Sequence, residues 1–314
     1  MNGDGLGSVD SLDERKIHYI DVGGVRTRYF EDGAGDPLVL LSGGEFGSLY
    51  SLDAWSLNLA ELAKSFHVFA LDKLGQGHTD NPVSDDEYTF DSVVKHVSTF
   101  VETQGLTRFH LVGHSRGGLV ASWLAQTEPS AVCSLVIVDS GSVADHDPET
   151  SDLDVYAELG LLKGWDPDVT PTLETVGIEP KGQAYYQESV TDDFLRRLLN
   201  IAELPKTNVA QRRMAALSED VWYPSVNRRR AKNLDGIRRQ GFRVPTLIVW
   251  GMNDKTAPVE RGRALFDEVS VHTAECEWHV LNGAGHCSFR DQPVAFNRVV
   301  AGFCGQHRCE PVSR

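Results

Sequence analysis

Phe109-His-Leu-Val-Gly-His-Ser-Arg-Gly-Gly118 is the stretch that decides the fold. Its first half is an apolar run that predicts a strand, and an amphipathic helix with Leu119, Trp123 and Leu124 on its apolar face starts at Arg116. Between them, Gly113-His114-Ser115-Arg116-Gly117 matches the pattern G-x-S-x-G. In a tight strand-to-helix turn the central serine takes a strained backbone geometry, and the flanking glycines avoid clashes. The pattern predicts a Ser115 hydroxyl exposed at a helix N-terminus, where developing negative charge is favoured. His114 is interpreted as a packing residue.

Short apolar runs bounded by turn residues recur around this segment. Residues 25–30 alternate in character and predict an antiparallel strand. Other runs are continuously apolar, as in strands buried on both faces of a mostly parallel sheet: 37–42, 67–72, 109–113, 134–139 and 246–251. Helical spacing covers 90–101, with Gly105 closing that helix, and 294–303. This alternation predicts an α/β domain with a three-layer sandwich and a mostly parallel central sheet.

Residues 141–244 interrupt the alternation. They contain helical pieces at 153–162, 191–202 and 209–217 but no parallel-strand run. An insertion between two core strands predicts a helical cap over the carboxyl edge of the sheet, where ligands bind in open α/β sheets. We therefore expect a core of 16–140 and 245–304, the cap at 141–244, a disordered N-terminal tail at 1–15 and a C-terminal tail at 305–314.

Composition excludes several classes of partner. The chain has 314 residues, 41% of them hydrophobic, and a formal net charge of −15. That charge disfavours nucleic acid and anionic membranes as partners, and no run approaches the ~20 apolar residues of a membrane span. The acidic, Gly-rich N-terminus leads us to expect no secretory signal, and five cysteines, an odd number, predict free thiols in a reducing, cytoplasmic compartment. Cys304, His307 and Cys309 are interpreted as incidental, so neither metal nor cofactor is expected, and homo-oligomer formation stays open.

A serine hydroxyl needs a base, and the base needs an orienting carboxylate. His286 follows a strand-like run, 277–281, in a Gly-rich loop, and the chain order Ser…Asp…His requires a late histidine. It is favoured over His272, His279 and His307. Asp254 follows the run 246–250 and is the favoured acid, with Asp139 at the end of the preceding strand as its rival.

An oxyanion hole needs two N–H donors. The Arg116 N–H is one candidate, because it directly follows Ser115. The loop Ser42-Gly43-Gly44-Glu45-Phe46-Gly47 should supply the other, with Gly44 preferred to Gly43. Phe46 of this loop is a candidate substrate contact.

From about residue 18 to 303 the chain resembles the α/β-hydrolase superfamily. Four motifs carry the resemblance: Ser42-Gly-Gly, Asp72-x-x-Gly-x-Gly77, Gly113-His-Ser-Arg-Gly117 and the Asp254/His286 pair. Trp55-Ser-Leu-Asn58, Leu74-Gly-Gln-Gly-His-Thr-Asp-Asn-Pro82 and Val244-Pro-Thr-Leu-Ile-Val-Trp-Gly251 make it most similar to meta-cleavage-product hydrolases and their ester-cleaving relatives. The resemblance implies a cofactor-free serine hydrolase acting with water on a small molecule. Haloalkane dehalogenase and epoxide hydrolase chemistry are disfavoured, because those relatives have Asp where Ser115 stands.

The C–C hydrolases carry residues that bind their dienoate substrate, and this chain differs from them at several of these positions. They have Trp after the catalytic His, where this chain has Cys287, and Asn before the early Trp, where it has Ala54. Their carboxylate-binding cap Arg aligns near Leu198, with Arg196 and Arg197 beside it, and a one-residue shift would restore it. We therefore favour hydrolysis of small aromatic or alkyl esters, with Arg197 and Cys287 as candidate substrate contacts. C–C cleavage of 2-hydroxy-6-oxo-dienoates is the alternative, and a non-catalytic binding protein a further one.

Two roles are considered for the Arg116 side chain. It could bind a substrate carboxylate, which would suit a monoester of a dicarboxylic acid. A salt bridge to a neighbouring Asp or Glu is the favoured reading.

Overall fold

The central element is a single eight-stranded sheet in the order β1-β2-β4-β3-β5-β6-β7-β8. The computed structural model describes residues 10, 12–145, 152–161 and 167–309. The strands are β1 (Ile17–Val22), β2 (Val25–Gly33), β3 (Pro37–Leu41), β4 (His67–Leu71), β5 (Phe109–His114), β6 (Val132–Val138), β7 (Thr246–Gly251) and β8 (Cys276–Leu281). β2 pairs antiparallel with β1 and with β4, whereas the remaining neighbours are parallel. The mostly parallel sheet is as predicted, and β1 is a strand that the sequence patterns missed.

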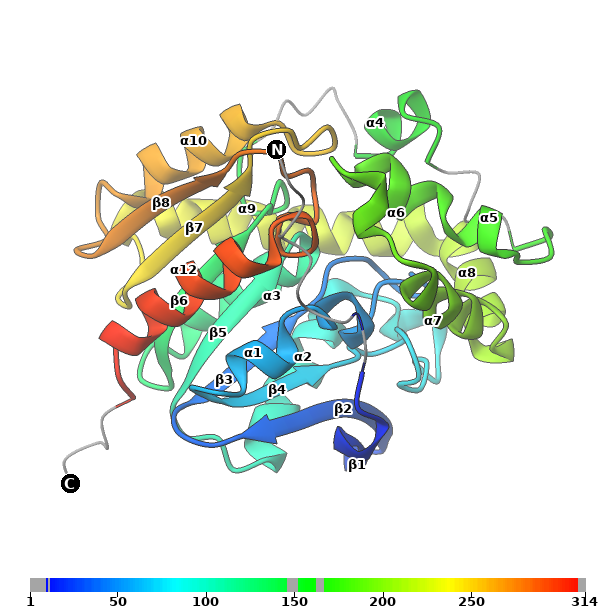
Figure 1. The fold of residues 1–314 in the computed structure, drawn as a ribbon, viewed down its shortest axis with the longest axis horizontal. Coiled ribbons are helices and arrows are strands. Elements are labelled where there is room, and N and C mark those ends of the chain that lie inside the picture. The colour runs from blue at the N-terminus through cyan, green and yellow to red at the C-terminus, as the bar shows by residue number, and fades with distance from the viewer. Residues whose placement is uncertain (1–9, 11, 146–151, 162–166, 310–314) are drawn as a thin grey trace, which may run out of the picture.

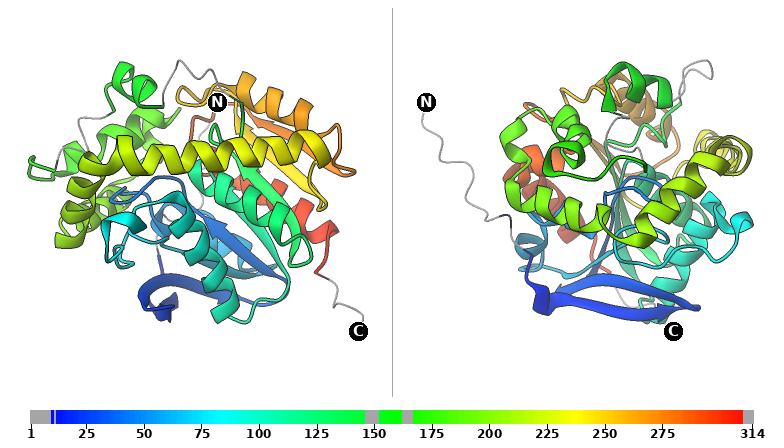
Figure 2. Two further views of the ribbon diagram at one scale, coloured as in Figure 1. Left: turned by 180° about the vertical axis from the view of Figure 1, so that it is seen from behind. Right: turned by 90° about the vertical axis from the view of Figure 1, so that its right-hand side faces the viewer.

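Both faces of the sheet are buried, which explains the continuous apolar runs. Along β3, Val39 and Leu41 belong to one hydrophobic cluster, and Leu38 and Leu40 belong to the other. Helices α2 (Phe90–Thr103), α3 (Arg116–Thr127), α9 (Tyr223–Gln240) and α10 (Val259–Val269) cover the first face. Helices α1 (Leu59–Leu62), α11 (Ser288–Asp291) and α12 (Pro293–Gln306) cover the second. Figure 1 shows α1 and α12 in front of the sheet, and the reverse view in Figure 2 shows α9 and α3 on the other side.

The cap region is helical, as predicted. Five helices gather at one side of the molecule (Figure 1): α4 (Asp152–Glu158), α5 (Leu173–Val176), α6 (Ile178–Gln183), α7 (Asp192–Ala202) and α8 (Pro205–Leu217). The rest of the expected range holds α9, which contacts α2, α3 and α10 of the core. The patterns missed this long helix because two of its buried positions are Arg230 and Asn233. Polar residues on the buried face hide the helical period of apolar side chains.

The expected disorder does not hold throughout the N-terminal tail: a short 3-10 helix, Glu14–Lys16, begins within it, and Asp10 is held by ion pairs. Residues 1–9 lie outside the described part of the chain, but Asp10 is buried. Its carboxylate pairs with Arg290 at 2.7 Å and with Arg197 at 2.5 Å, and accepts a hydrogen bond from Ser56 Oγ at 2.5 Å. These partners hold the pKa of Asp10 down at about 2, although burial by itself would raise it. Buried ion pairs of this kind fix a segment whose composition gives no sign of order.

The expectation of free thiols throughout is wrong at two positions. Cys133 and Cys309 form a disulfide that spans 176 residues of sequence, whereas Cys276, Cys287 and Cys304 are free. Spacing gave no signal for this pair, because strand β6 and the segment after α12 meet only in the folded chain. Among the described residues, no helix has the length and apolar character needed to cross a membrane.

Candidate active site

Ser115 lies in the turn between β5 and α3 with a strained backbone, at φ 51° and ψ −123°. The neighbouring glycines are required by close approach rather than by their own φ angles. A Cβ on Gly113 would lie 2.3 Å from the Gly117 carbonyl oxygen, and one on Gly117 would lie 2.5 Å from that of Ser42. A non-glycine residue with positive φ is costly and persists only where its surroundings enforce it. The turn therefore presents the hydroxyl above the carboxyl end of β5, at the start of α3.

His286 and Asp254 come from two further loops at the same edge of the sheet. His286, after β8, lies with Nε2 3.2 Å from Ser115 Oγ and Nδ1 2.7 Å from Asp254 Oδ2. Burial tends to lower the pKa of His286, but the Asp254 carboxylate outweighs it, and the net pKa is raised. The chain thus brings its three predicted residues into one hydrogen-bonded series.

The loop after β7 fixes the Asp254 carboxylate. Its Oδ1 accepts hydrogen bonds from Thr256 N at 2.8 Å, Thr256 Oγ1 at 2.9 Å and Ala257 N at 2.9 Å. The other oxygen, Oδ2, contacts His286 Nδ1. Such bonds stabilise the ionised carboxylate, the form that can orient a histidine and stabilise its charged state.

The rival carboxyl, Asp139, is also buried here but has different partners. It accepts hydrogen bonds from the backbone N–H groups of Gly251 at 2.6 Å and Ser288 at 3.2 Å. Burial and the nearby Asp254 carboxylate raise its pKa to about 8. Asp139 therefore links the ends of β6 and β7 to α11, while Asp254 contacts the imidazole.

His114 also contacts His286. Its Nε2 lies 2.9 Å from the His286 carbonyl oxygen, and its ring packs edge-on against Phe289 and Trp55. Burial lowers the pKa of His114 well below its usual value, so the ring is neutral. This agrees with the packing role predicted for it, with the added effect of holding the His286 loop.

The other oxyanion-hole candidates, Gly43 and Gly44, lie on the loop after β3. Lys73 Nζ donates to the carbonyl oxygens of Ser42 at 2.5 Å and Gly43 at 3.0 Å, and Gln76 Nε2 donates to Gly43 O at 2.9 Å. Because N–H and C=O of a trans peptide point in opposite directions, the Gly44 N–H is directed away from Lys73 and Gln76. Within the described residues that N–H makes no hydrogen bond, and Gly44 lines the pocket beside Ser115. Gly43 packs directly against the nucleophile, because a Cβ added to it would lie 2.9 Å from Ser115 Cβ.

A polar pocket opens over Ser115. The following residues line it: Gly44, Glu45, Tyr50, His114, Ser115, Arg116, Gly141, Ser142, Tyr156, Glu179, Gln183, Tyr223, Thr256, Ala257, Arg261 and His286. Gln183, from the cap, links two of the tyrosines: it accepts from Tyr50 Oη at 2.7 Å and donates to Tyr156 Oη at 2.8 Å. The sequence analysis missed these cap residues, because no motif or period marks which side of a short helix faces a pocket.

Three predicted substrate contacts lie outside this pocket. Phe46 packs against Trp222 and Tyr88 in the core, and Arg197 is held by Asp10. Cys287 is buried, with its thiol 3.7 Å from Tyr50 Oη. Apolar packing, an ion pair and burial respectively take these side chains away from the pocket. Arg116 does line it, but pairs with Glu45 at 3.3 Å, the salt bridge favoured for it.

Arg261, which the sequence analysis did not single out, also lines the pocket, from the first turn of α10. Its partly buried guanidinium lies beside Gly141 and has no acidic partner within ion-pair distance among the described residues. The pocket therefore holds one arginine that is charge-compensated and one that is available to an anion.

The chain is similar to known proteins over most of its length. A family model described as alpha/beta hydrolase fold matches residues 36–293. 2-Hydroxy-6-oxo-6-(2'-aminophenyl)hexa-2,4-dienoic acid hydrolase of Metapseudomonas resinovorans is 25% identical and covers 91% of this chain and 89% of its own length. 2-Hydroxymuconate semialdehyde hydrolase of Pseudomonas sp. strain CF600 is 27% identical, with 92% and 94% covered. The solved meta-cleavage product hydrolase of Pseudomonas fluorescens IP01 superposes with a TM-score of 0.73 at 24% identity, over 93% of this chain and 99% of that one.

Proposed function

Since the chain belongs to the alpha/beta hydrolase fold family, we propose that it is a serine hydrolase with Ser115, His286 and Asp254 as its catalytic triad. The observation that carries the proposal is the series of contacts from Asp254 through His286 to Ser115, which faces a pocket. Ser115 Oγ attacks the substrate carbonyl while His286 Nε2 takes its proton, and the Asp254 carboxylate stabilises the imidazolium. The N–H groups of Arg116 and Gly44 bind the oxyanion.

The same groups complete the cycle. His286 returns its proton to the departing alcohol, which leaves Ser115 acylated. A water then enters, gives its proton to His286 and attacks the acyl carbon. Collapse of the second tetrahedral intermediate releases the carboxylic acid and restores the Ser115 hydroxyl.

We favour carboxylic esters over a C–C bond as substrate. C–C cleavage needs groups that hold the carboxylate and oxo oxygens of a dienoate while it ketonises. Two positions that serve this purpose in the resembling hydrolases are Ala54 and Cys287 here, and both are buried away from the pocket. Leu198, at the third, is buried as well. Without these groups a dienoate carboxylate would depend on Arg261 alone.

Arg261 supports a narrower substrate class, an ester that bears a second, free carboxylate. A guanidinium lining the pocket without an acidic partner is suited to bidentate binding of such a group. Arg116 is less suited, because Glu45 already compensates its charge.

Two measurements test the proposal. A fluorophosphonate probe should label the wild-type protein and fail to label Ser115→Ala, whereas a non-catalytic binding protein would not be labelled at all. A hydrolysis panel should then compare neutral p-nitrophenyl esters, aromatic and alkyl monoesters of dicarboxylic acids, and a ring-cleavage dienoate. Higher kcat/KM on esters supports the proposal. Much faster turnover of the dienoate would reassign the enzyme to C–C hydrolysis. One of the two bacterial relatives is named as a hydrolase of a dienoic acid.

A further inference from the structure

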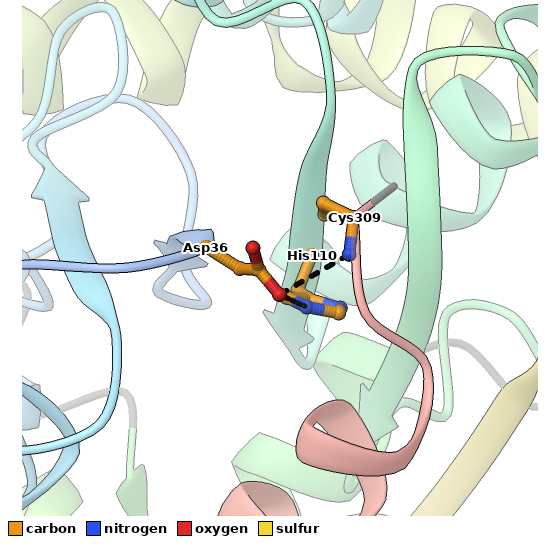
Figure 3. Close-up of side chains that lie close together, drawn as sticks. All are labelled: Asp36, His110 and Cys309. Carbon is orange, nitrogen blue, oxygen red and sulfur yellow. Dashed lines mark hydrogen bonds and ion pairs between the residues drawn. The ribbon is translucent and has the colours of Figure 1, made fainter. Parts of the chain in front are cut away.

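Three side chains of types that bind metals, from distant parts of the chain, lie close together (Figure 3). They lie near the amino end of β5, whereas Ser115 follows its carboxyl end. Asp36 directly precedes β3, His110 is the second residue of β5, and Cys309 follows α12. One ligand atom from each lies within 4.8 Å of the other two. Ligand atoms on one tetrahedral zinc ion lie about 3 to 4 Å apart, given metal–ligand bonds of about 2.0 to 2.3 Å. The three atoms are thus near the spacing that a single ion requires.

The buried His110 ring points a lone pair into this cluster. Its Nδ1 lies 2.8 Å from Ser134 Oγ, and the Ser134 hydroxyl donates to Cys304 Sγ at 3.6 Å. Since that hydroxyl hydrogen is used, Ser134 Oγ accepts from Nδ1–H, and the neutral ring has its lone pair on Nε2. Nε2 is buried without a hydrogen-bond partner among the described residues. A ligating histidine fixed through its second nitrogen in this way is the usual arrangement at metal sites.

The group facing that lone pair is a carboxylate. Asp36 Oδ2 lies 3.9 Å from His110 Nε2. Two acceptors that face each other across this gap repel, and a cation between them would satisfy both. At present Asp36 Oδ2 instead accepts from Arg308 Nε at 3.0 Å and from the Cys309 backbone N–H at 3.1 Å. The Arg308 side chain is 71% exposed, so a divalent cation that binds Asp36 can displace it into solvent.

In the oxidised protein Cys309 has no free thiol, because it forms a disulfide. Cys309 Sγ is bonded to Cys133 Sγ, and a disulfide sulfur is a poor metal ligand compared with a thiolate. Reduction by a dithiol transfers two electrons and two protons to this pair, so that Cys133 and Cys309 become thiols and the reductant becomes a disulfide. Both sulfurs are then free beside His110 and Asp36. Binding of a zinc ion would displace the thiol protons.

We propose that Asp36, His110, Cys309 and Cys133 form a zinc-class divalent cation site that exists only in the reduced protein. The disulfide and the metal are alternative ways to hold the C-terminal segment to the amino ends of β5 and β6. Charge explains the alternation: the oxidised cluster offers one carboxylate, already paired with Arg308, with further positive charge from Arg108 nearby. Two thiolates added on reduction outweigh those cations and match the soft, tetrahedral preference of zinc.

The test is zinc binding by the full chain, free of any affinity tag, in two redox states. Oxidised protein and protein reduced with a phosphine, which does not itself hold zinc as a dithiol would, are titrated with Zn²⁺ against a chromogenic chelator. We expect about one tightly bound equivalent in the reduced protein and none in the oxidised protein. Co²⁺ in place of zinc should give a thiolate-to-metal charge-transfer band in the reduced form alone.

Variants separate this site from adventitious binding. Cys309→Ser should lose the bound equivalent and the Co²⁺ band, while Cys276→Ser, a matched change at a free cysteine, should keep both. Asp36→Asn should weaken zinc binding at least tenfold. It tests the site without changing the buried His110, whose substitution could prevent folding. The proposal is overturned if reduced wild type binds no more zinc than oxidised protein, or if Cys309→Ser binds zinc like wild type.

Discussion

At the scale of single residues, Ser115 and His286 are expected to act as one unit. Ser115→Ala and His286→Ala should each lower kcat on a good ester by about 10⁴- to 10⁶-fold, because each removes proton transfer as well as nucleophilic attack. The double variant should lose little more than either single one. Pre-steady-state and steady-state rates of p-nitrophenyl ester cleavage measure this. Additive losses, or substantial activity in Ser115→Ala, would place the nucleophile elsewhere.

Asp254 and Asp139 both follow core strands, but only Asp254 contacts the imidazole, at 2.7 Å. Asp254→Asn should therefore lower kcat by about 10⁴-fold, through loss of histidine orientation and of imidazolium stabilisation. Asp139→Asn should change kcat by less than about 10-fold, because the buried Asp139, with its pKa raised to about 8, is protonated and uncharged at neutral pH. Measuring kcat for both variants at pH 7 decides the assignment, and the reverse ranking would make Asp139 the orienting acid.

Arg261 should control charge selectivity. In Arg261→Gln, kcat/KM for a monomethyl ester of a dicarboxylic acid should fall about 10- to 100-fold, as expected for a lost charge-assisted hydrogen bond. The dimethyl ester of the same acid should react as in wild type. Arg263→Gln is the matched control, since Arg263 lies on the same helix but is exposed and paired with Asp267. Equal effects on both esters would point to a structural role, and no effect on either would remove Arg261 from substrate recognition while leaving the triad proposal intact.

At the scale of elements, the loop after β3 depends on the segment after β4. Lys73 holds two carbonyl groups of that loop, and burial lowers the pKa of its amine to about 7. Lys73→Met keeps the volume but removes both hydrogen bonds, so the Gly44 peptide should lose its orientation. We expect kcat to fall about 10- to 100-fold with a smaller change in KM, because an oxyanion donor acts in the transition state.

The control for this change is Lys64→Met, at an exposed lysine paired with Glu61. Circular dichroism and thermal unfolding of the Lys73 variant show whether the fold is retained. A folded Lys73→Met protein with raised KM and unchanged kcat would mean that the loop binds substrate without stabilising the oxyanion.

At the scale of the whole molecule, buried neutral histidines should make the fold sensitive to acid. Burial lowers the pKa of His96 and of His110 to about 4, against 6.5 for the exposed side chain. Between these values the unfolded chain binds more protons than the folded one, so stability falls as pH drops from about 6.5 to 4. The loss should be at most about 3.4 kcal/mol for each histidine.

Urea unfolding at pH 7 and pH 4.5 measures this loss directly. His96→Gln should flatten the pH dependence relative to wild type, because it removes one of the groups that must take up a proton. The exposed His272→Gln should leave the dependence unchanged. A stability that stays constant down to pH 4.5 would contradict the prediction.

The sequence by itself determined the parallel strands of the sheet and the turn that presents Ser115, and it provides the residues of the proposed triad in their order along the chain. Continuous apolar runs mark doubly buried strands, and G-x-S-x-G marks a turn whose crowding excludes other residues; both signals are local along the chain. The late loop His286 and the post-strand Asp254 followed from the chain order that this turn implies. The sequence also favours a salt bridge from Arg116 to a neighbouring acid, and the structure identifies that acid as Glu45.

Tertiary structure alone decided which side chains share a site. Arg197 pairs with Asp10, Phe46 packs in the core and Cys287 contacts Tyr50. The pocket is instead lined by Arg261, Gln183 and Tyr156, whose elements carry no recognisable motif. Residues 133 and 309 became a disulfide in the same way. Such contacts join segments more than a hundred residues apart, and their partners are chosen by packing and charge compensation across the fold, which leave no period or spacing in the chain.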